Sequence, residues 1–173
     1  MLEPPAMRTL GLDVGTKTIG VALSDEGGSI ATAREVLSRR GHEADAKAVV
    51  ERVTREGVRA VVVGLPLELN GREGHRARLV RRFVAVLEPQ LAVVAGGPVP
   101  VRTWDERFST AAAERTLLEA DVSRAGRKRK VDALAAQFIL QGWLDAQTRE
   151  AEADDAPADE ADAADDAVQE SAG

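Results

Sequence analysis

The stretch LGLDVGTKTIGVALSD, residues 10–25, decides the fold. Its first half alternates apolar residues with residues that can face the other way, which is the pattern of a β-strand ending near Asp13. Gly15 follows, and strand character returns at 21–23. The stretch therefore predicts two strands joined by a tight turn. A carboxylate beside the bare backbone of Gly15 fits either a site for a hard cation and a phosphate or a plain acidic hairpin turn.

The rest of the chain alternates strand patterns with helix patterns. Further strands are predicted at 30–37, 58–64 and 101–105, and helices at 43–56, 76–87, 111–120 and 131–145. A connection is predicted from Pro89 to Pro100, and a basic loop over 121–130. Three antiparallel strands come first, and crossover helices make the later strands parallel. The order predicts an α/β fold with a mixed five-stranded sheet and helices on both faces.

Length and composition predict one domain with two extensions. The 173 residues contain no cysteine, which excludes a disulfide framework and a Cys-based zinc site. No apolar stretch is long enough to cross a membrane, and the first residues lack the features of a signal peptide. We expect a disordered leader at 1–7, a domain at 8–148 and a disordered acidic tail at 149–173.

The net charge of −6 is unevenly distributed along the chain. Residues 150–173 hold ten acidic residues and no Lys or Arg, which leaves 19 acidic and 23 basic residues in the body. A mildly basic body is compatible with a polyanionic partner. The tail is either a solubilising extension or a mimic of nucleic acid that screens the body, and the first alternative is favoured.

Three carboxylates are candidates for one site. Asp13 ends the first strand, Glu106 follows the last strand, and Asp132 opens the apolar face of the last helix, in its predicted first turn. Ligands of parallel sheets bind at the carboxyl ends of strands, so the three can share one edge. Carboxylates without a histidine partner suit Mg²⁺ or Mn²⁺, and a pair of such ions can cleave a phosphodiester.

Each carboxylate also has a purely structural explanation. Asp132 could interact favourably with the helix dipole, and Glu106 could pair with Arg107. Asp105 competes with Glu106 for any metal role. The two histidines, His42 and His75, lie in polar segments and are expected at the surface.

Four segments together resemble the YqgF family, also called RuvX, of bacterial RNase H-like nucleases. They are GLDVGTKTIGVALSD (11–25), VVVGLPLELNGREG (61–74), TWDERFSTAAAERTL (103–117) and KRKVDALAAQFILQGWLD (128–145), in the order of the family. Two positions depart from the family pattern: Thr18 stands where Arg is frequent, and Phe108 where Leu is common.

The resemblance implies an RNase H-like fold and a cytoplasmic, divalent-metal-dependent nuclease. It implies processing of the 5′ end of precursor 16S rRNA, with the assembling small ribosomal subunit as a possible partner, or alternatively resolution of Holliday junctions. Its acidic site maps onto Asp13, Glu106 and Asp132. We expect the chain to act as a monomer or a homodimer, and we expect no association with a membrane.

Basic residues are candidates for phosphate contacts, or else form a solvated charged surface. They are Lys17, Arg72, Arg76, Arg127, Lys128, Arg129 and Lys130. Aromatic residues are scarce, so recognition by shape and backbone is favoured over base stacking. Two other functions remain open, namely an ATPase of the actin and sugar-kinase superfamily and a nucleic-acid-binding module that does not cleave.

Overall fold

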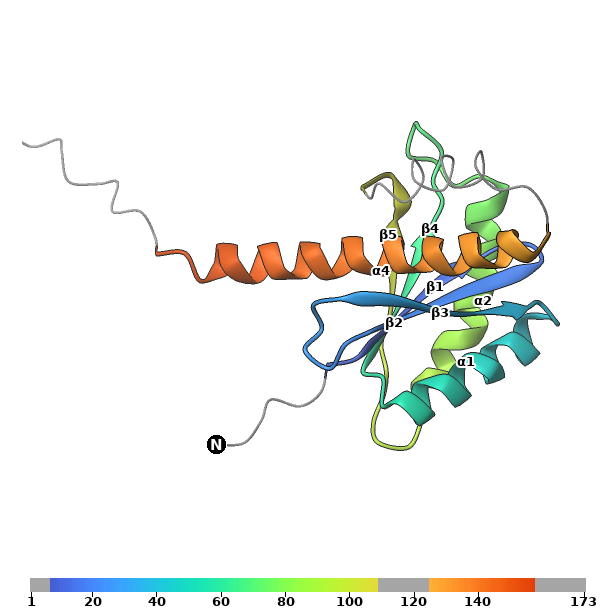
Figure 1. Cartoon of the computed structure of the whole chain (residues 1–173), viewed down its shortest axis with the longest axis horizontal. Helices are drawn as coiled ribbons and strands as arrows, with labels where there is room; N and C mark the ends of the chain where they lie inside the picture. Colours follow the sequence, from blue (N-terminus) through green and yellow to red (C-terminus); the bar gives the residue numbers. More distant parts are fainter. Residues whose placement is uncertain (1–6, 109–124, 158–173) are drawn as a thin grey trace, which may run out of the picture.

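A five-stranded sheet forms the centre of the molecule (Figure 1). The computed structural model describes residues 7–108 and 125–157. The strand order is β3-β2-β1-β4-β5. The strands are β1 (Thr9–Val14), β2 (Thr18–Ser24), β3 (Ala31–Ser38), β4 (Ala60–Leu65) and β5 (Val101–Asp105). The first three strands are antiparallel, and β4 pairs in parallel with both β1 and β5, which confirms the predicted mixed sheet.

Short turns connect the antiparallel strands. The amide of Gly15 donates to the carbonyl of Thr18 at 2.8 Å and closes the turn between β1 and β2. Before β3, the carboxylate of Asp25 accepts the amides of Ser29 and Ile30, both at 2.8 Å. The amides of Ile30 and Ser29 lower the pKa of Asp25, because they stabilise its charged form.

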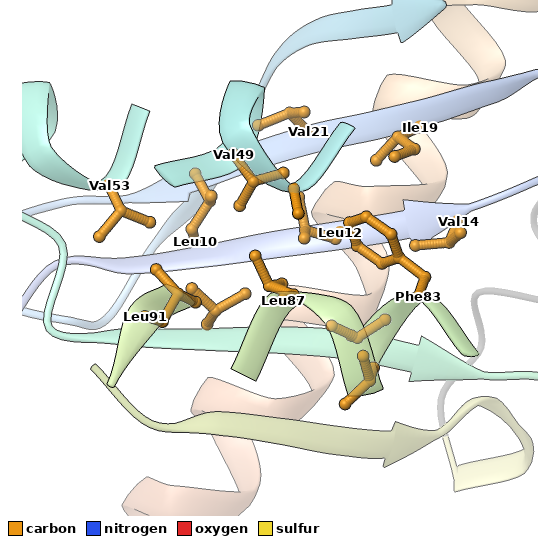
Figure 2. Packing of buried hydrophobic residues seen from close by; sticks show 14 of the residues in the cluster. Leu10, Leu12, Val14, Ile19, Val21, Val49, Val53, Phe83, Leu87 and Leu91 are labelled. Carbon is orange, nitrogen blue, oxygen red and sulfur yellow. The ribbon is translucent and has the colours of Figure 1, made fainter. Parts of the chain in front are cut away.

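Two helices cover one face of the sheet. They are α1 (His42–Glu56) and α2 (His75–Leu91), each of which precedes a parallel strand. The alternate residues of β1 that face them are large and aliphatic, and Figure 2 shows these side chains meeting those of α1 and α2. The labelled residues are Leu10, Leu12, Val14, Ile19, Val21, Val49, Val53, Phe83, Leu87 and Leu91. This face holds the main hydrophobic core.

The third helix, α4 (Ala125–Asp154), covers the opposite face and crosses the strands from β3 to β4. It lies close to the backbone: a Cβ built on Gly11 would meet Cβ of Leu140 at 2.6 Å. Ala136, Ile139 and Leu140 of α4 are buried against Val62 of β4. Helices thus lie on both faces, as predicted, and the end of α4 projects beyond the sheet (Figure 1).

The end of α2 differs from the prediction. The sequence predicts an end at residue 87 and a connection from Pro89, but α2 contains Pro89 and continues to Leu91. Leu91 is fully buried, and its carbonyl accepts the amide of Val99 at 2.9 Å. Burial of Leu91 offsets the cost of a proline in the last helical turn.

α4 is longer than predicted at both ends. It begins at 125, where a loop was expected, and it continues to 154, six residues into the expected disordered tail. The prediction was wrong at these positions because it weighed charge and lack of apolar surface above helix propensity. Most residues of these added turns are Ala, Arg, Lys, Gln or Glu, which are strong helix formers.

Some expectations lie outside the described residues. These are the helix at 111–120, the leader at 1–6 and the tail at 158–173. Met7, expected in the leader, donates its amide to the carbonyl of Glu26 at 3.0 Å. Within the described ranges, no helix is long and apolar enough to cross a membrane.

Candidate metal and nucleic-acid site

Asp13 lies at the end of β1 on the face covered by α4. Its neighbours Leu12 and Val14 point into the core on the other face. Asp13 itself is only 7% exposed. Across the sheet, Asp13 pairs with Gly20 of β2. On the other side, the register Leu12↔Val63 brings Asp13 next to Gly64 of β4. Asp13 is therefore flanked by two positions without side chains.

Asp132 and Glu106 approach these two glycines, Asp132 with its backbone and Glu106 with its carboxylate. A Cβ built on Gly20 would lie 2.0 Å from the backbone oxygen of Asp132, and a Cβ built on Gly64 would lie 2.8 Å from Oε1 of Glu106. Neighbouring strands are about 4.8 Å apart. These contacts place Asp132 beside Gly20 and Glu106 beside Gly64, on either side of Asp13, and we call these three acidic residues the carboxylate row.

The carboxylate row matches a hard divalent cation in its donor atoms, which are all oxygens. Glu106, which opens the short 3₁₀ helix η1 (Glu106–Phe108) after β5, is 8% exposed, so Asp13 and Glu106 are both shielded from water, whereas Asp132 is half-buried. Both Asp13 and Glu106 have interaction partners. Among the described residues, no three acidic or histidine side chains are grouped closely enough to enclose one ion. The three residues therefore fit a hard cation by their donor atoms, and their grouping around an ion stays a prediction.

Thr18, which sequence reasoning missed, fixes the orientation of Asp132. Its hydroxyl donates to Oδ2 of Asp132 at 2.7 Å. Because α4 begins at 125, Asp132 is not in the first helical turn as predicted, so the dipole explanation for its charge falls away. The unusual residue at position 18 was the sequence signal that could have pointed to this contact.

Asp105 is directed away from the row. Its Oδ2 accepts hydrogen bonds from two nitrogens of Arg107, from Nε at 3.0 Å and from Nη2 at 2.6 Å. The side chain of Arg107 lowers the pKa of Asp105, and the same hydrogen bonds raise the pKa of Arg107. This pairing occupies the carboxylate of Asp105 with Arg107, which favours Glu106 over Asp105 for the proposed metal role.

Arg39, also missed, supports the turn that follows Asp13. Its guanidinium donates to the carbonyl of Gly15 at 2.7 Å and to Asp45 at 2.6 Å, and it contacts Nδ1 of His42 at 3.1 Å. It also lies over the ring of Phe83, 5.6 Å from the centroid. This nearly buried ion pair joins the β1–β2 turn to α1 and α2.

The predicted phosphate-binding residues whose side chains are described are all exposed: Lys17, Arg72, Arg76 and Lys130. Lys17 lies in the turn after β1, and Arg72 and Arg76 follow the end of β4. Arg127, Lys128 and Arg129 lie in the first turns of α4 rather than in a loop, and their side chains are outside the described part.

Comparison with known sequences identifies close relatives. Residues 7–146 match the model of a family described as "RuvX: Holliday junction resolvase". A protein of Symbiobacterium thermophilum named "Putative pre-16S rRNA nuclease" is 54% identical over 141 residues, which cover 82% of this chain and 94% of that protein. A protein of Myxococcus xanthus with the same name is 52% identical over 140 residues, 81% of this chain and 89% of the relative.

Comparison with solved structures supports the fold. The structure of T. thermophilus RuvC in complex with Holliday junction substrate is similar with a TM-score of 0.53 at 18% identity, and the match covers 82% of this chain and 96% of that one. At this identity the likeness concerns the fold alone. The mixed sheet is therefore of the RNase H-like type expected from the sequence.

Proposed function

The chain belongs to the RuvX family, and from that premise we propose that it is a divalent-metal-dependent nuclease that processes the 5′ end of precursor 16S rRNA. Its relatives named for a pre-16S rRNA nuclease, together with the family, make it a hydrolase acting on nucleic acid. The finer assignment, to one metal class and one substrate, is supported by the site.

The observation that carries the proposal is the carboxylate row over two glycines. Asp13, Glu106 and Asp132 would hold Mg²⁺ or Mn²⁺, as two ions. When bound, such ions activate a water and stabilise the leaving oxygen of a phosphodiester. The protein then needs no nucleophilic side chain, which agrees with the placement of both histidines at the starts of α1 and α2.

The surrounding residues prepare the row for a ligand. The hydroxyl of Thr18 donates to Oδ2 of Asp132 and so orients that carboxylate. Arg39 holds the turn after Asp13 through the carbonyl of Gly15. These contacts order the Asp132 side chain and the turn after Asp13 before a substrate arrives, so less ordering is required on binding.

The exposed basic residues would position the phosphate backbone. Lys17, Arg72, Arg76 and Lys130 lie in segments next to the row, and the basic turn at 127–129 precedes Asp132 by one helical turn. Each phosphate contact steepens the salt dependence of binding by about one unit of log–log slope. Binding that weakens strongly with salt is the expected result.

RNA is favoured over a DNA junction because RNA processing needs a single site. Junction resolution calls for two sites related by two-fold symmetry. The family description, "Holliday junction resolvase", supports junction cleavage as the second candidate. The first candidate places the protein in the cytoplasm, with the assembling small ribosomal subunit as its partner.

The test is cleavage of two substrates by the purified chain with Mg²⁺ or Mn²⁺. One is an RNA carrying the precursor 16S 5′ leader, and the other is a four-way DNA junction. Asp13→Asn is the control in both. RNA cut near the mature end, with the junction intact, is the expected outcome.

Other outcomes correct the proposal in defined ways. Paired nicks in the junction would assign the chain to resolution and predict a homodimer, to be checked by light scattering. Cleavage that persists in Asp13→Asn would remove the carboxylate row from the chemistry. If the chain binds either substrate but cleaves neither at any metal concentration, it is a nucleic-acid-binding module that does not cleave.

A further inference from the structure

Leu69 is the most exposed large apolar side chain in the described part of the chain. It is 98% exposed, compared with 82% for Val93, 63% for Ile30 and 58% for Met7. It lies between β4 and α2, in the segment that leaves the carboxyl end of β4. This is the edge of the sheet on which the carboxylate row lies.

The backbone around Leu69 is fixed. The amide of Gly71 donates to the carbonyl of Glu68 at 2.8 Å, and the amide of Glu68 donates to the carbonyl of Arg72 at 3.0 Å. The amide of Arg72 also donates to Oδ1 of Asn70 at 2.9 Å. Gly71 has φ of 81°, which a tight turn of this kind requires. Leu69 thus stands at the tip of a hydrogen-bonded turn, residues 68–72, and its exposure is built into the fold.

The turn is braced against the residue that follows Glu106. A Cβ built on Gly71 would lie 3.3 Å from Nη1 of Arg107, so the guanidinium packs on the turn. Asp105 holds Arg107 in that position through two hydrogen bonds to one carboxylate oxygen. The tip of the turn and the carboxylate row therefore belong to one connected unit.

The charge around the tip favours a polyanion. Glu73 is paired with Arg81 at 2.8 Å, and Glu68 turns back toward Gly74, where its Oε1 lies 2.7 Å from a Cβ position. Arg72 and Arg76 are exposed, and neither forms an ion pair with any residue in the described ranges. Arg72 and Arg76 both follow the apolar tip in the chain, and exposed cations near an apolar side chain match the phosphates and base faces of a nucleic acid.

We propose that Leu69 is a wedge that inserts against the bases at the end of a duplex segment of the substrate, next to the cleaved strand. This inference rests on the proposed function, since it requires a nucleic acid at the carboxylate row. Leucine is among the apolar residues that proteins insert between base steps. A wedge at this place would separate paired from unpaired substrate and so select the position of the cut.

The experiment uses the full chain with Asp13→Asn, so that the probe stays intact. The probe is an RNA hairpin with single-stranded arms, with 2-aminopurine at the last base pair of the stem. Insertion of Leu69 unstacks that base, and we expect the fluorescence to rise on binding. Leu69→Ser should abolish the rise and weaken binding about tenfold, because burying a leucine is worth at least one decade of affinity.

Two further variants control for other effects. Leu69→Phe restores an apolar wedge and should restore the fluorescence rise. Val93→Ser removes an apolar side chain of similar exposure before the amino end of β5, at the end of the sheet opposite to Leu69. It should behave like the parent, which is the chain that carries Asp13→Asn alone.

The outcomes separate the wedge from the nuclease. Equal affinity and an equal fluorescence rise for the parent and Leu69→Ser would overturn the wedge and leave the nuclease standing; Leu69 would then serve another kind of partner. A parent that binds without any fluorescence rise also overturns the wedge. A parent that binds neither this RNA nor a four-way DNA junction overturns both proposals.

Discussion

The two faces of the sheet are built on opposite principles. Toward α1 and α2, β1 and β2 present large aliphatic residues such as Leu12 and Ile19, which are fully buried. Toward α4, the same two strands present Gly11, Asp13 and Gly20. One face gains stability from interlocking side chains, and the other removes side chains so that a helix can approach the backbone.

The difference separates stability from the site. Large buried side chains contribute the larger part of the hydrophobic free energy. Glycines in strands weaken them, because a glycine has no side chain to pack and loses more backbone entropy. The face covered by α4 accepts that cost and in return lets the backbone of Asp132 reach Gly20 and the carboxylate of Glu106 reach Gly64. Mutations on the two faces should therefore act on different observables.

The largest effect is expected on the core face, at Leu87. Leu87→Ala leaves a cavity between α2 and the sheet and should lower the free energy of unfolding by about 3–4 kcal/mol. Cleavage per folded molecule should stay unchanged at low temperature. Urea denaturation and an activity assay on the same sample measure both. A loss of specific activity larger than the loss of folded protein would contradict the separation of the faces.

Gly20→Ala should have the largest effect on the site face. The new Cβ would lie 2.0 Å from the backbone oxygen of Asp132, so α4 must move. A displacement of about 1 Å at a reacting group can cost about a hundredfold in rate, and we expect a loss of that order. Ile19→Val, one residue away on the core face, is the matched control. It should lower stability by about 1 kcal/mol and leave the rate unchanged.

Gly64→Ala should have a smaller effect than Gly20→Ala. Its Cβ would meet Cδ1 of Ile139 at 2.5 Å and Oε1 of Glu106 at 2.8 Å. Both atoms are at the ends of side chains and can move, whereas a backbone oxygen cannot move alone. We expect a loss of about tenfold in rate and a higher Mn²⁺ requirement, because small positional errors are costly. Calorimetric titration with Mn²⁺ checks the second point; an unchanged titration would remove Glu106 from metal binding.

The smallest effect concerns the ion pair between β3 and α1. Nη2 of Arg52 donates to Glu35 at 3.0 Å, and this contact lowers the pKa of Glu35 below 4.5. The pair therefore stabilises the fold at pH values above 4.5 and loses its contribution as the pH falls through the lowered pKa. Because Glu35 is 37% exposed, screening limits the contribution to about 0.5 kcal/mol. When the free energy of unfolding is measured from about pH 6 to pH 3, it should fall slightly less for Glu35→Gln than for the unsubstituted protein.

The sequence predicted the sheet well, because its signals are local. The alternation around Asp13 and the apolar run at 58–64 identify strands by period and composition. The lengths of the connections decide which strands are antiparallel and which are parallel. The carboxyl ends of β1 and β5, near which Asp13 and Glu106 lie, come to the same end of the sheet in that order.

The contacts that complete the site depend on distant residues and were not predictable in this way. Thr18 and Asp132 are 114 residues apart, and no local pattern links them. In the sequence, Gly20 and Gly64 indicate only breaks or ends of strands. The need for a residue without a side chain at these positions becomes visible only when the position of α4 is known. The start of α4 was misplaced for a related reason: basic residues at 127–130 suggested a loop, whereas they continue a helix.

The position of Asp132 in the last helix determines when the site comes into being. The five strands can pair before α4 exists, since none of their ladders includes it. Asp132 reaches Gly20 only when α4 docks, and docking requires Ile139 and Leu140 as well. Until Asp132 is added to a growing chain, only two of the three acidic residues are present, so the row that we propose to bind metal forms after the strands of the sheet have been synthesised. The order of elements along the chain thus separates formation of the sheet from formation of the proposed site.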